Sequence, residues 1–323
     1  MSKIDMANIL VIRREFLMIN GVDISNLNDL VNINLIKNQG NSFIIAKATE
    51  GSTFIDKYYN YNIKWAKELG LVTGAYHFAR FHDRTKAVEE AYFFKSIVLG
   101  NKPDLVVLDV EQQVSGDITE ICLDFLDIIS TVAPALIYCN PSYIKAHLNS
   151  SITKYPLWIA NYGVSSPSTV LWKEYAIWQY TEKGKISGIN GYFDLNYMSK
   201  AFYNSLHTNK PVKTDILVEQ IKSLQYNLNI DYNAKLIIDG IVGPATMAAL
   251  KGIESLIIKG HKSHVVLWMQ QKLEQYGYLK ENSYTPMLYD EATFQAVTEL
   301  QKNWGRSTDG ILKTQTWNVF LNN

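Results

Sequence analysis

Two carboxylates, Asp109 and Glu111, directly follow the apolar run 105–108, with one residue between them. Side chains of a strand alternate between its two faces, so both acids are expected on the same face. Crowded carboxylates cannot all ionise freely, and at least one should keep its proton to an unusually high pH. That property suits acid–base chemistry. Taken alone, however, the D-x-E spacing favours solvated charges at the end of a surface strand. Whether the two acids form a functional site therefore depends on the residues elsewhere in the chain.

The elements around this pair predict an α/β protein. From residue 21 onward, eight short apolar runs, most of them continuous rather than alternating, are typical of buried parallel strands. Helical patterns separate the early strands but become scarce after residue 140. This order predicts an irregular eight-stranded β/α barrel, followed by a small all-helical domain. The predicted strands are 22–25, 43–49, 72–79, 105–111, 135–140, 157–162, 176–181 and 192–198, and the predicted helices are 28–38, 57–69, 85–98 and 118–130.

In a barrel of this kind, functional groups lie at the C-terminal ends of the strands. Polar and aromatic residues recur at almost every predicted strand end, which is typical of a polar, aromatic-lined cleft over the barrel mouth. The candidates are Asp23, Lys47, Glu50, Tyr76, His77, Arg80, Asp109, Glu111, Tyr138, Asn140, Trp158, Asn161, Tyr162, Trp178, Gln179, Tyr180 and Asp194.

Several of these candidates also have simple structural explanations. Asp23 could cap the helical region that follows it, and His77 could bond the backbone instead of a substrate. Arg80 is expected to pair with an acid at the mouth. Trp158 could belong to the barrel core, although its position just before 160–162 favours the cleft wall. The tyrosines expected in the cleft are Tyr76, Tyr138 and Tyr162.

Eight short motifs in this order resemble the family 25 glycoside hydrolases, the lysozymes (N-acetylmuramidases) of bacteria and phages. Each motif is weak alone, but eight in register are specific, and they cover residues 20–206. The motifs are Gly21-Val22-Asp23-Ile24-Ser25, Ala46-Lys47-Ala48-Thr49-Glu50-Gly51, Gly74-Ala75-Tyr76-His77-Phe78-Ala79-Arg80, Asp109-Val110-Glu111, Ile137-Tyr138, Leu157-Trp158-Ile159-Ala160, Trp178-Gln179-Tyr180 and Asp194-Leu195-Asn196.

The resemblance implies cleavage of the β-1,4 bond between N-acetylmuramic acid and N-acetylglucosamine in peptidoglycan, with retention of configuration. It also implies that Glu111 is the proton donor and that Asp23, Asp109 and Asp194 complete an acidic cluster. Glycoside cleavage needs an acid for the leaving oxygen and negative charge near the forming oxocarbenium centre, which fits these roles. The residues expected to bind the substrate are Lys47, Glu50, Tyr76, His77, Arg80, Tyr138, Trp158, Tyr162, Trp178 and Gln179.

Within the cluster, Glu111 has the longer side chain and is furthest towards the mouth, so it is expected to reach the glycosidic oxygen. Asp109 is expected to orient the N-acetyl group of the substrate, whose carbonyl oxygen would attack the anomeric carbon. Asp194 would share that task. The sequence leaves open whether this acetamido group or a carboxylate is the nucleophile.

A second barrel family shares part of this pattern. Family 18 chitinases carry D-x-x-D-x-D-x-E on the same strand, and Asp104, Asp109 and Glu111 match it. Val107 stands at the remaining aspartate position. This apolar residue argues against a chitinase, although it is compatible with similar substrate-assisted chemistry.

The C-terminal part, 216–323, contains a repeated unit. The unit is a helix with a Leu-Gln or Met-Gln pair, then in most cases an Asp-Gly turn, and then a Thr before the next apolar helix. It resembles the small helical peptidoglycan-binding domain of wall hydrolases, with a full copy at 264–323 and a shorter one at 216–253. The motif residues are expected to hold the helices together, so the ligand groove is placed elsewhere, near Trp304 or Tyr278.

Composition excludes several classes of partner. The chain of 323 residues has 31 basic and 31 acidic side chains, so neither nucleic acid nor an anionic membrane is expected as a partner. No window approaches the ~18 apolar residues of a membrane span. Cys122 and Cys139 are expected to be free thiols without metal-ligand spacing, and neither metal nor cofactor is predicted.

The start of the chain sets further expectations. The apolar run 7–12 is too short for a secretory signal, and residues 1–17 do not resemble the opening of a domain. One hypothesis is that translation begins at Met18, which would give a barrel domain at 18–206 and, because 207–215 lack periodicity, a linker there.

These features favour an endolysin of a phage or prophage. Such a protein would be made in the cytoplasm of the bacterial host and would reach the wall after holin-type release. One alternative is a bacterial autolysin with the same chemistry. Another is a non-catalytic wall-binding protein on a decayed hydrolase barrel, against which the intact acidic cluster argues.

Overall fold

The structure, a computed structural model, describes residues 18–208 and 216–322. The chain divides into two compact units at residues 213 and 214, each with its own hydrophobic core. The predicted extension 1–17 lies outside the described residues. So does most of the predicted linker 207–215, whose first two residues instead end a helix.

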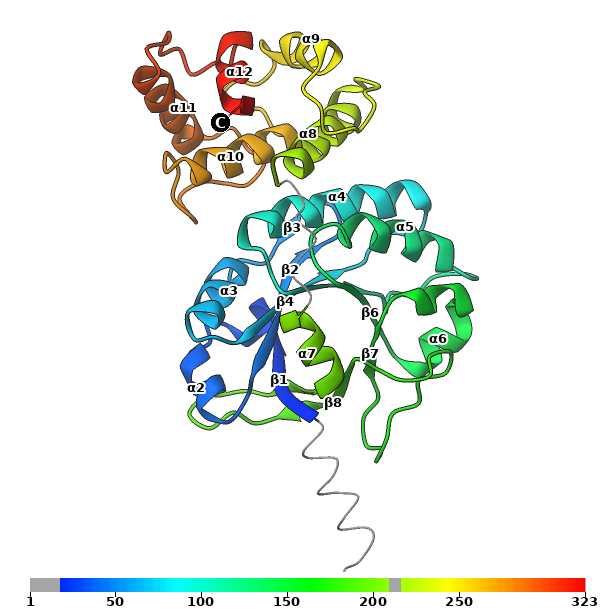
Figure 1. The fold of residues 1–323 in the computed structure, drawn as a ribbon. Helices are drawn as coiled ribbons and strands as arrows, with labels where there is room; N and C mark the ends of the chain where they lie inside the picture. The colour runs from blue at the N-terminus through cyan, green and yellow to red at the C-terminus, as the bar shows by residue number, and fades with distance from the viewer. Residues whose placement is uncertain (1–17, 209–215, 323) are drawn as a thin grey trace, which may run out of the picture. The chain divides into compact units, whose positions relative to one another are not determined.

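The N-terminal unit is a closed barrel of eight strands with one short additional strand (Figure 1). The strands are β1 (Met18–Ile24), β2 (Phe43–Glu50), β3 (Phe54–Ile55), β4 (Val72–Phe78), β5 (Leu105–Asp109), β6 (Ala135–Cys139), β7 (Leu157–Ala160), β8 (Ile177–Gly184) and β9 (Phe193–Ser199). Strand β1 closes the ring by pairing in parallel with β2 and antiparallel with β9. The remaining neighbours in the ring are parallel except β8 and β9, and β3 forms a hairpin with β2. The predicted irregular eight-stranded barrel is confirmed.

The strands are continuously apolar because both of their faces are buried. One set of side chains, including Phe43, Leu105 and Val107, fills the barrel interior. The alternate set, including Val106 and Leu108, packs against the surrounding helices. Each fully buried side chain of this size stabilises the fold by about 1.5–3 kcal/mol relative to its exposure. Two-sided burial therefore explains why the sequence shows runs instead of alternation.

Helices cover the outside of the ring and one of its ends. They are η1 (Asn26–Asn28), α2 (Ile33–Asn38), α3 (Tyr59–Glu68), α4 (Arg84–Asn101), α5 (Thr119–Ile129), α6 (Pro141–His147), η2 (Ser150–Lys154) and α7 (Lys200–Thr208). Helix α4 begins where Asp83 accepts a hydrogen bond from Lys86 N at 2.9 Å. Helix α7 packs Phe202, Tyr203 and Leu206 against the interior cluster and lies across the ring in Figure 1. The sequence patterns missed α6, α7 and β3, which are short elements.

The C-terminal unit is helical and repeats one structural device. Its helices are α8 (Ile216–Tyr232), α9 (Pro244–Ile253), α10 (His264–Gln275), α11 (Glu291–Asn303) and α12 (Thr314–Asn322). Gln225, Gln270 and Gln301 are each at most 1% exposed and bind the loop that follows their helix. Gln225 Oε1 accepts from Gly240 N, and Gln301 Oε1 accepts from Gly310 N, both at 2.9 Å. The repeated glutamines hold packing together, as the sequence predicts.

None of the helices that the structure describes has the length and the apolar character that crossing a membrane requires.

Candidate active site

Four carboxyl groups gather at one end of the barrel. Asp23 is the penultimate residue of β1, Asp109 ends β5, and Glu111 follows two residues later. Asp194 is the second residue of β9, and because β9 is antiparallel to its neighbours, its beginning lies at the end of the barrel where they finish. The groups are close enough to influence one another's ionisation. The structure therefore brings the four predicted acids together.

Asp23 is buried and held by two amide side chains. Its Oδ2 accepts hydrogen bonds from Gln179 Nε2 at 2.9 Å and from Asn196 Nδ2 at 2.7 Å. Burial and then the charge of Asp194 raise the pKa of Asp23 well above its usual range. Burial also raises the pKa of Asp194, to about 6. The two carboxyls are hydrogen-bonded to each other, so the pair retains a proton to a higher pH than isolated carboxyls would.

Asp109 and Glu111 differ in exposure although they come from one strand end. Asp109 is 6% exposed, and its Oδ1 accepts no hydrogen bond from any residue that the structure describes. Burial, followed by the charge of Glu111, raises the pKa of Asp109. Glu111 is exposed, yet partial burial of its carboxyl raises its pKa as well, against the charges of Lys47 and Arg80. Glu111 is thus an accessible carboxyl that keeps its proton longer than usual.

Gln179 links the acidic cluster to two tyrosines. Its Oε1 accepts hydrogen bonds from Tyr138 Oη at 2.9 Å and from Tyr162 Oη, while its Nε2 donates to Asp23. These partners fix the orientation of the amide. Tyr138 is 8% exposed, whereas Tyr162 is 40% exposed. Tyr162 therefore offers an accessible ring face next to the cluster.

Tyr76 and Trp158 point into the barrel beneath the acids. Tyr76 is half-buried, and burial, followed by the charges of Asp23 and Asp109, raises the pKa of its hydroxyl. Trp158 is 2% exposed and donates its Nε1–H to Asn196 Oδ1 at 2.8 Å. Asn196 in turn binds Asp23. Trp158 belongs to the barrel core and supports the cluster through Asn196, so its predicted place in the cleft wall is wrong.

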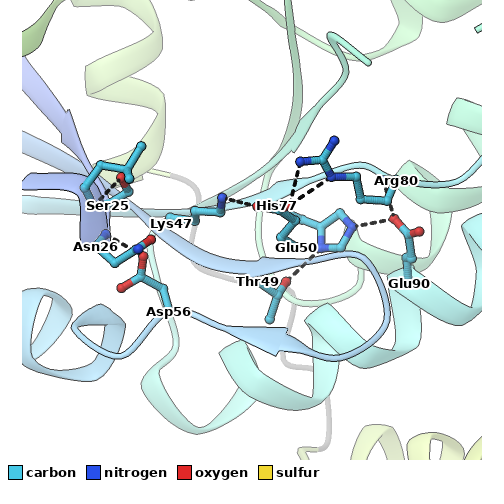
Figure 2. Close-up of polar contacts among 10 residues, drawn as sticks. Ser25, Asn26, Lys47, Thr49, Glu50, Asp56, His77, Arg80 and Glu90 are labelled. Carbon is cyan, nitrogen blue, oxygen red and sulfur yellow. Dashed lines mark hydrogen bonds and ion pairs between the residues drawn. The ribbon is translucent and has the colours of Figure 1, made fainter. Parts of the chain in front are cut away.

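His77 lies outside the barrel wall, and its predicted contact with substrate is wrong. Its ring is fully buried, with Nδ1 bonded to Thr49 Oγ1 at 2.7 Å and Nε2 to Glu90 Oε2 at 2.9 Å (Figure 2). It packs on Phe94 and Phe125 of the helix layer. Burial lowers its pKa even though Glu90 opposes this effect. The reason for the error is strand alternation, because His77 occupies the face opposite to Tyr76 and Phe78.

Trp178 is a second residue on the outward face. It is 6% exposed, packs against Tyr180 and Tyr197, and donates its Nε1–H to the Asn161 carbonyl at 2.9 Å. It belongs to the hydrophobic core between strands and helices. Its neighbour Gln179 points inward and reaches Asp23. Trp178 therefore supports the wall from outside and does not have the substrate-binding position that was predicted.

The rim of the mouth carries an ion-pair ladder. Glu50 Oε2 lies 2.5 Å from Lys47 Nζ, and Glu50 Oε1 accepts from Arg80 Nε and Nη2 at 2.8 and 2.7 Å (Figure 2). Both cations also lie over the ring of Phe78. Lys47 and Arg80 outweigh burial and lower the pKa of Glu50. The expected pairing of Arg80 with an acid is present.

Two residues that support the acidic cluster or its rim were not recognised from the sequence. Asn196 was part of a motif without a role, although its two-residue spacing from Asp194 on a strand was a signal. Glu90 gave no signal, because in a sequence a buried acid within a helix looks the same as an exposed one.

Two residues singled out in the sequence lie away from the cluster. Asn140 caps α6 through Tyr143 N, and Asp104 accepts hydrogen bonds from Thr73 N and Oγ1, near the start of β4.

A β/α barrel with carboxyl groups of unequal exposure at its mouth is the architecture of a glycoside hydrolase. Within residues 18–208 and 216–322, no group of three or more His, Cys, Asp or Glu side chains is arranged to hold a metal ion.

Comparison with known proteins identifies the family within the glycoside hydrolases. The family model for glycosyl hydrolases family 25 matches residues 22–189, more than half of the chain, and the chain belongs to this family. The model for a putative peptidoglycan binding domain matches residues 263–320. The autolytic lysozyme of Clostridium acetobutylicum is 32% identical over 248 residues, which cover 73% of each protein.

Two solved structures are similar in sequence and fold. The CTP1L endolysin shares 52% identity, with a TM-score of 0.58, over 60% of this chain and 71% of that one. The catalytic domain of endolysin ply40, from bacteriophage P40 of Listeria monocytogenes, shares 27% identity with a TM-score of 0.52. That similarity covers 60% of this chain and 98% of the other.

Proposed function

We propose that this chain is a 1,4-β-N-acetylmuramidase that hydrolyses the bond between N-acetylmuramic acid and N-acetylglucosamine of peptidoglycan. The observation that carries the proposal is the pairing of an exposed, proton-retaining Glu111 with a buried Asp109 at the barrel mouth. The name of one relative, an autolytic lysozyme, supports the same bond class.

In the first step, Glu111 gives its proton to the glycosidic oxygen as the bond from that oxygen to the anomeric carbon breaks. The carbonyl oxygen of the substrate's own acetamido group forms a new bond to the anomeric carbon from the opposite face. The Asp109 carboxylate, which is 6% exposed, accepts the acetamido N–H and orients the group for this attack. The Asp23–Asp194 pair adds negative charge where positive charge develops.

In the second step, water attacks the anomeric carbon and the bond to the acetamido oxygen breaks. The Glu111 carboxylate takes the proton from that water, which restores the acid for the next cycle. Two inversions at one carbon give net retention of configuration. Tyr162 offers a ring face on which a sugar can stack, and Tyr76 and Tyr138 shape the floor of the cleft.

The C-terminal unit is proposed to keep the enzyme on its polymeric substrate. In this division, residues 18–206 cleave the glycan and residues 216–323 bind the wall. The match of a peptidoglycan-binding model to residues 263–320 supports this role. The surface near Trp304 or Tyr278 is the proposed contact region.

The proposed biological setting is lysis by a phage or prophage. The protein would be made in the host cytoplasm and would reach the wall once a holin opens the membrane. The similarity to two endolysins supports this setting, while the lysozyme of C. acetobutylicum supports autolysis as the alternative. Expression in a host with and without a co-expressed holin distinguishes the two, because an endolysin should lyse cells only with the holin.

Mass spectrometry of digested and borohydride-reduced peptidoglycan tests the activity. A muramidase should leave reduced muramic acid at the new ends. Reduced glucosamine ends would indicate the other glycosidic bond, and a freed alanine amine would indicate an amidase. The Glu111→Gln variant should produce no new ends, and wild-type rates from this variant would overturn the assignment of Glu111.

A further inference from the structure

Glu50 is an acid at the barrel mouth that is bonded to two cations. One carboxylate oxygen lies 2.5 Å from Lys47 Nζ, and the other accepts two hydrogen bonds from the Arg80 guanidinium. The side chain of Lys47 is 11% exposed, that of Glu50 is 25% exposed, and that of Arg80 is 50% exposed. Glu50 therefore has no oxygen left without a cationic partner, which is an unusual position for a residue that would itself bind a sugar hydroxyl.

Backbone register connects this ion-pair ladder to the acidic cluster. Glu50 on β2 pairs with Phe78 on β4, and Phe78 pairs with Asp109 on β5. The three residues form one row across neighbouring strands at the mouth. Lys47 Nζ lies 5.1 Å and Arg80 Cζ 4.5 Å from the centre of the Phe78 ring. Glu50 thus stands two strands away from the end of β5, beyond which Glu111 lies, and Arg80 follows the strand between them, β4.

The ladder is anchored from the outer layer of the barrel. Glu90 Oε2 accepts a hydrogen bond from Arg80 N at 2.9 Å and is also bonded to His77. The other ring nitrogen of His77 is bonded to Thr49, the residue before Glu50. Figure 2 shows this chain of contacts running from Thr49 through His77 and Glu90 to Arg80. Both ends of the Glu50–Arg80 pair are therefore fixed to the same buried group.

We propose that Glu50 is a positioning residue that holds and partly neutralises Lys47 and Arg80, and thereby sets the pH range over which Glu111 can act as proton donor. This inference rests on the proposed function, because it takes Glu111 to be the donor. Glu50 acts through the two cations and needs no contact with substrate.

The charges around Glu111 support this role. Lys47 and Arg80 are the groups whose charges lower the pKa of Glu111 against its partial burial. Without Glu50, both cations would act on Glu111 without a neutralising partner, and Glu111 would lose its proton at lower pH. The titratable and charged groups that face Glu111 or the rest of the cluster are Asp23 on β1, Lys47 and Glu50 on β2, Tyr76 on β4, Arg80 after β4, Asp109 on β5, Tyr138 on β6, Tyr162 after β7, Glu182 on β8 and Asp194 on β9.

The test is the pH dependence of kcat/KM on soluble glycan chains, which reports ionisation in the free enzyme. In Glu50→Gln, which keeps the shape of the side chain, the basic limb should move to lower pH by about one unit. In Lys47→Met the same limb should move to higher pH, and the double variant should lie between the two single variants. Glu68→Gln, an exposed acid at the end of α3, is the matched control and should leave the limb unchanged.

A second readout does not depend on activity. Carbon-13 NMR of the labelled full chain follows the Glu111 carboxyl, assigned by its absence in Glu111→Gln, and its midpoint should shift to lower pH in Glu50→Gln. An unshifted midpoint and an unshifted limb in Glu50→Gln overturn the inference, even if Glu111→Gln is inactive. An active Glu111→Gln overturns the proposed donor instead, while the NMR midpoint still reports whether Glu50 controls Glu111. If Glu50→Gln fails to fold, an unshifted limb in Lys47→Met contradicts the inference.

Discussion

Asp23 and Asp194 lie directly opposite each other in the antiparallel β1–β9 pair, and their carboxyl groups share a hydrogen bond. One comes from the first strand of the barrel and the other from the last. Their contact is made where the barrel closes, so the acidic cluster and the closure of the fold depend on the same pair of strands.

This pair should make stability depend on pH. The pKa of Asp194 is about 6 in the folded protein against 3.8 for the free side chain, so the folded state binds the proton more tightly. The free energy of unfolding should therefore gain a contribution as pH falls from about 7 to about 4. Asp194→Asn lacks this contribution. Calorimetry at a series of pH values should show the wild-type barrel gaining stability relative to Asp194→Asn on acidification, and a constant difference would contradict the shared-proton pair.

Asp109→Asn should lower the activity and raise the stability of the barrel. Asp109 is buried with one oxygen lacking a hydrogen bond from the described residues, so its charge is costly to bury and a permanently neutral side chain should stabilise the barrel by about 1–2 kcal/mol. The variant should lower kcat about 100-fold or more with little change in KM, because the orienting charge is lost. Asp104→Asn is the control. It disturbs the hydrogen bonds to Thr73 and should lower the melting temperature without affecting kcat. Unchanged kcat in Asp109→Asn would remove Asp109 from the proposed reaction.

Glu90 should matter far more to stability than its neighbour Glu89. Glu90 is 3% exposed and accepts from both His77 and Arg80 N, so Glu90→Ala leaves buried donors unsatisfied and should cost about 3–4 kcal/mol. The side chain of Glu89 is 12% exposed and pairs with the exposed Lys86, and because Glu89→Ala leaves no buried donor unsatisfied there, it should cost about 1 kcal/mol or less. Chemical denaturation measures both. Similar losses of unfolding free energy in the two variants would contradict the larger contribution expected from the buried contacts of Glu90 with His77 and Arg80.

Gln270 should be required for the C-terminal unit. Its amide donates to Leu288 O and Thr293 Oγ1, and its Oε1 accepts from Met287 N. Gln270→Ala removes several buried hydrogen bonds and should destabilise this unit by about 2–4 kcal/mol. Gln275→Ala, an exposed position on the same helix, should have little effect. Calorimetry of the full chain should show the transition of the C-terminal unit moving while that of the barrel stays constant, and sedimentation with purified walls should show weaker binding.

The two units should be separable in function. Because the chain divides into two compact units, each with its own core, residues 18–206 are expected to cleave soluble glycan chains at a rate close to that of the full chain. They should bind insoluble walls weakly. Co-sedimentation and reducing-end assays on both forms provide the comparison, and a folded but inactive fragment would contradict the modular arrangement.

Much of the architecture could be predicted from the sequence because it depends on local patterns. Continuous apolar runs predicted the eight buried strands, and the placement of Asp23, Asp109 and Glu111 at strand ends predicted where they would meet. The Asp-Gly turns of the C-terminal repeat were predicted because glycine tolerates the positive φ angle that such a turn requires. Gly240 and Gly310 adopt φ angles of 78° and 70°.

The tertiary structure decided which way each of the other side chains faces. In a strand buried on both sides, apolar runs carry no information about inside and outside, so His77 and Trp178 could not be assigned to the outward face. Long-range contacts settled the rest. Asn196 binds Asp23 only because β9 runs antiparallel beside β1, and Glu50 joins Lys47 to Arg80 only because β4 pairs with β2. The sequence determined the chemical groups, and the closure of the barrel determined which of them share a site.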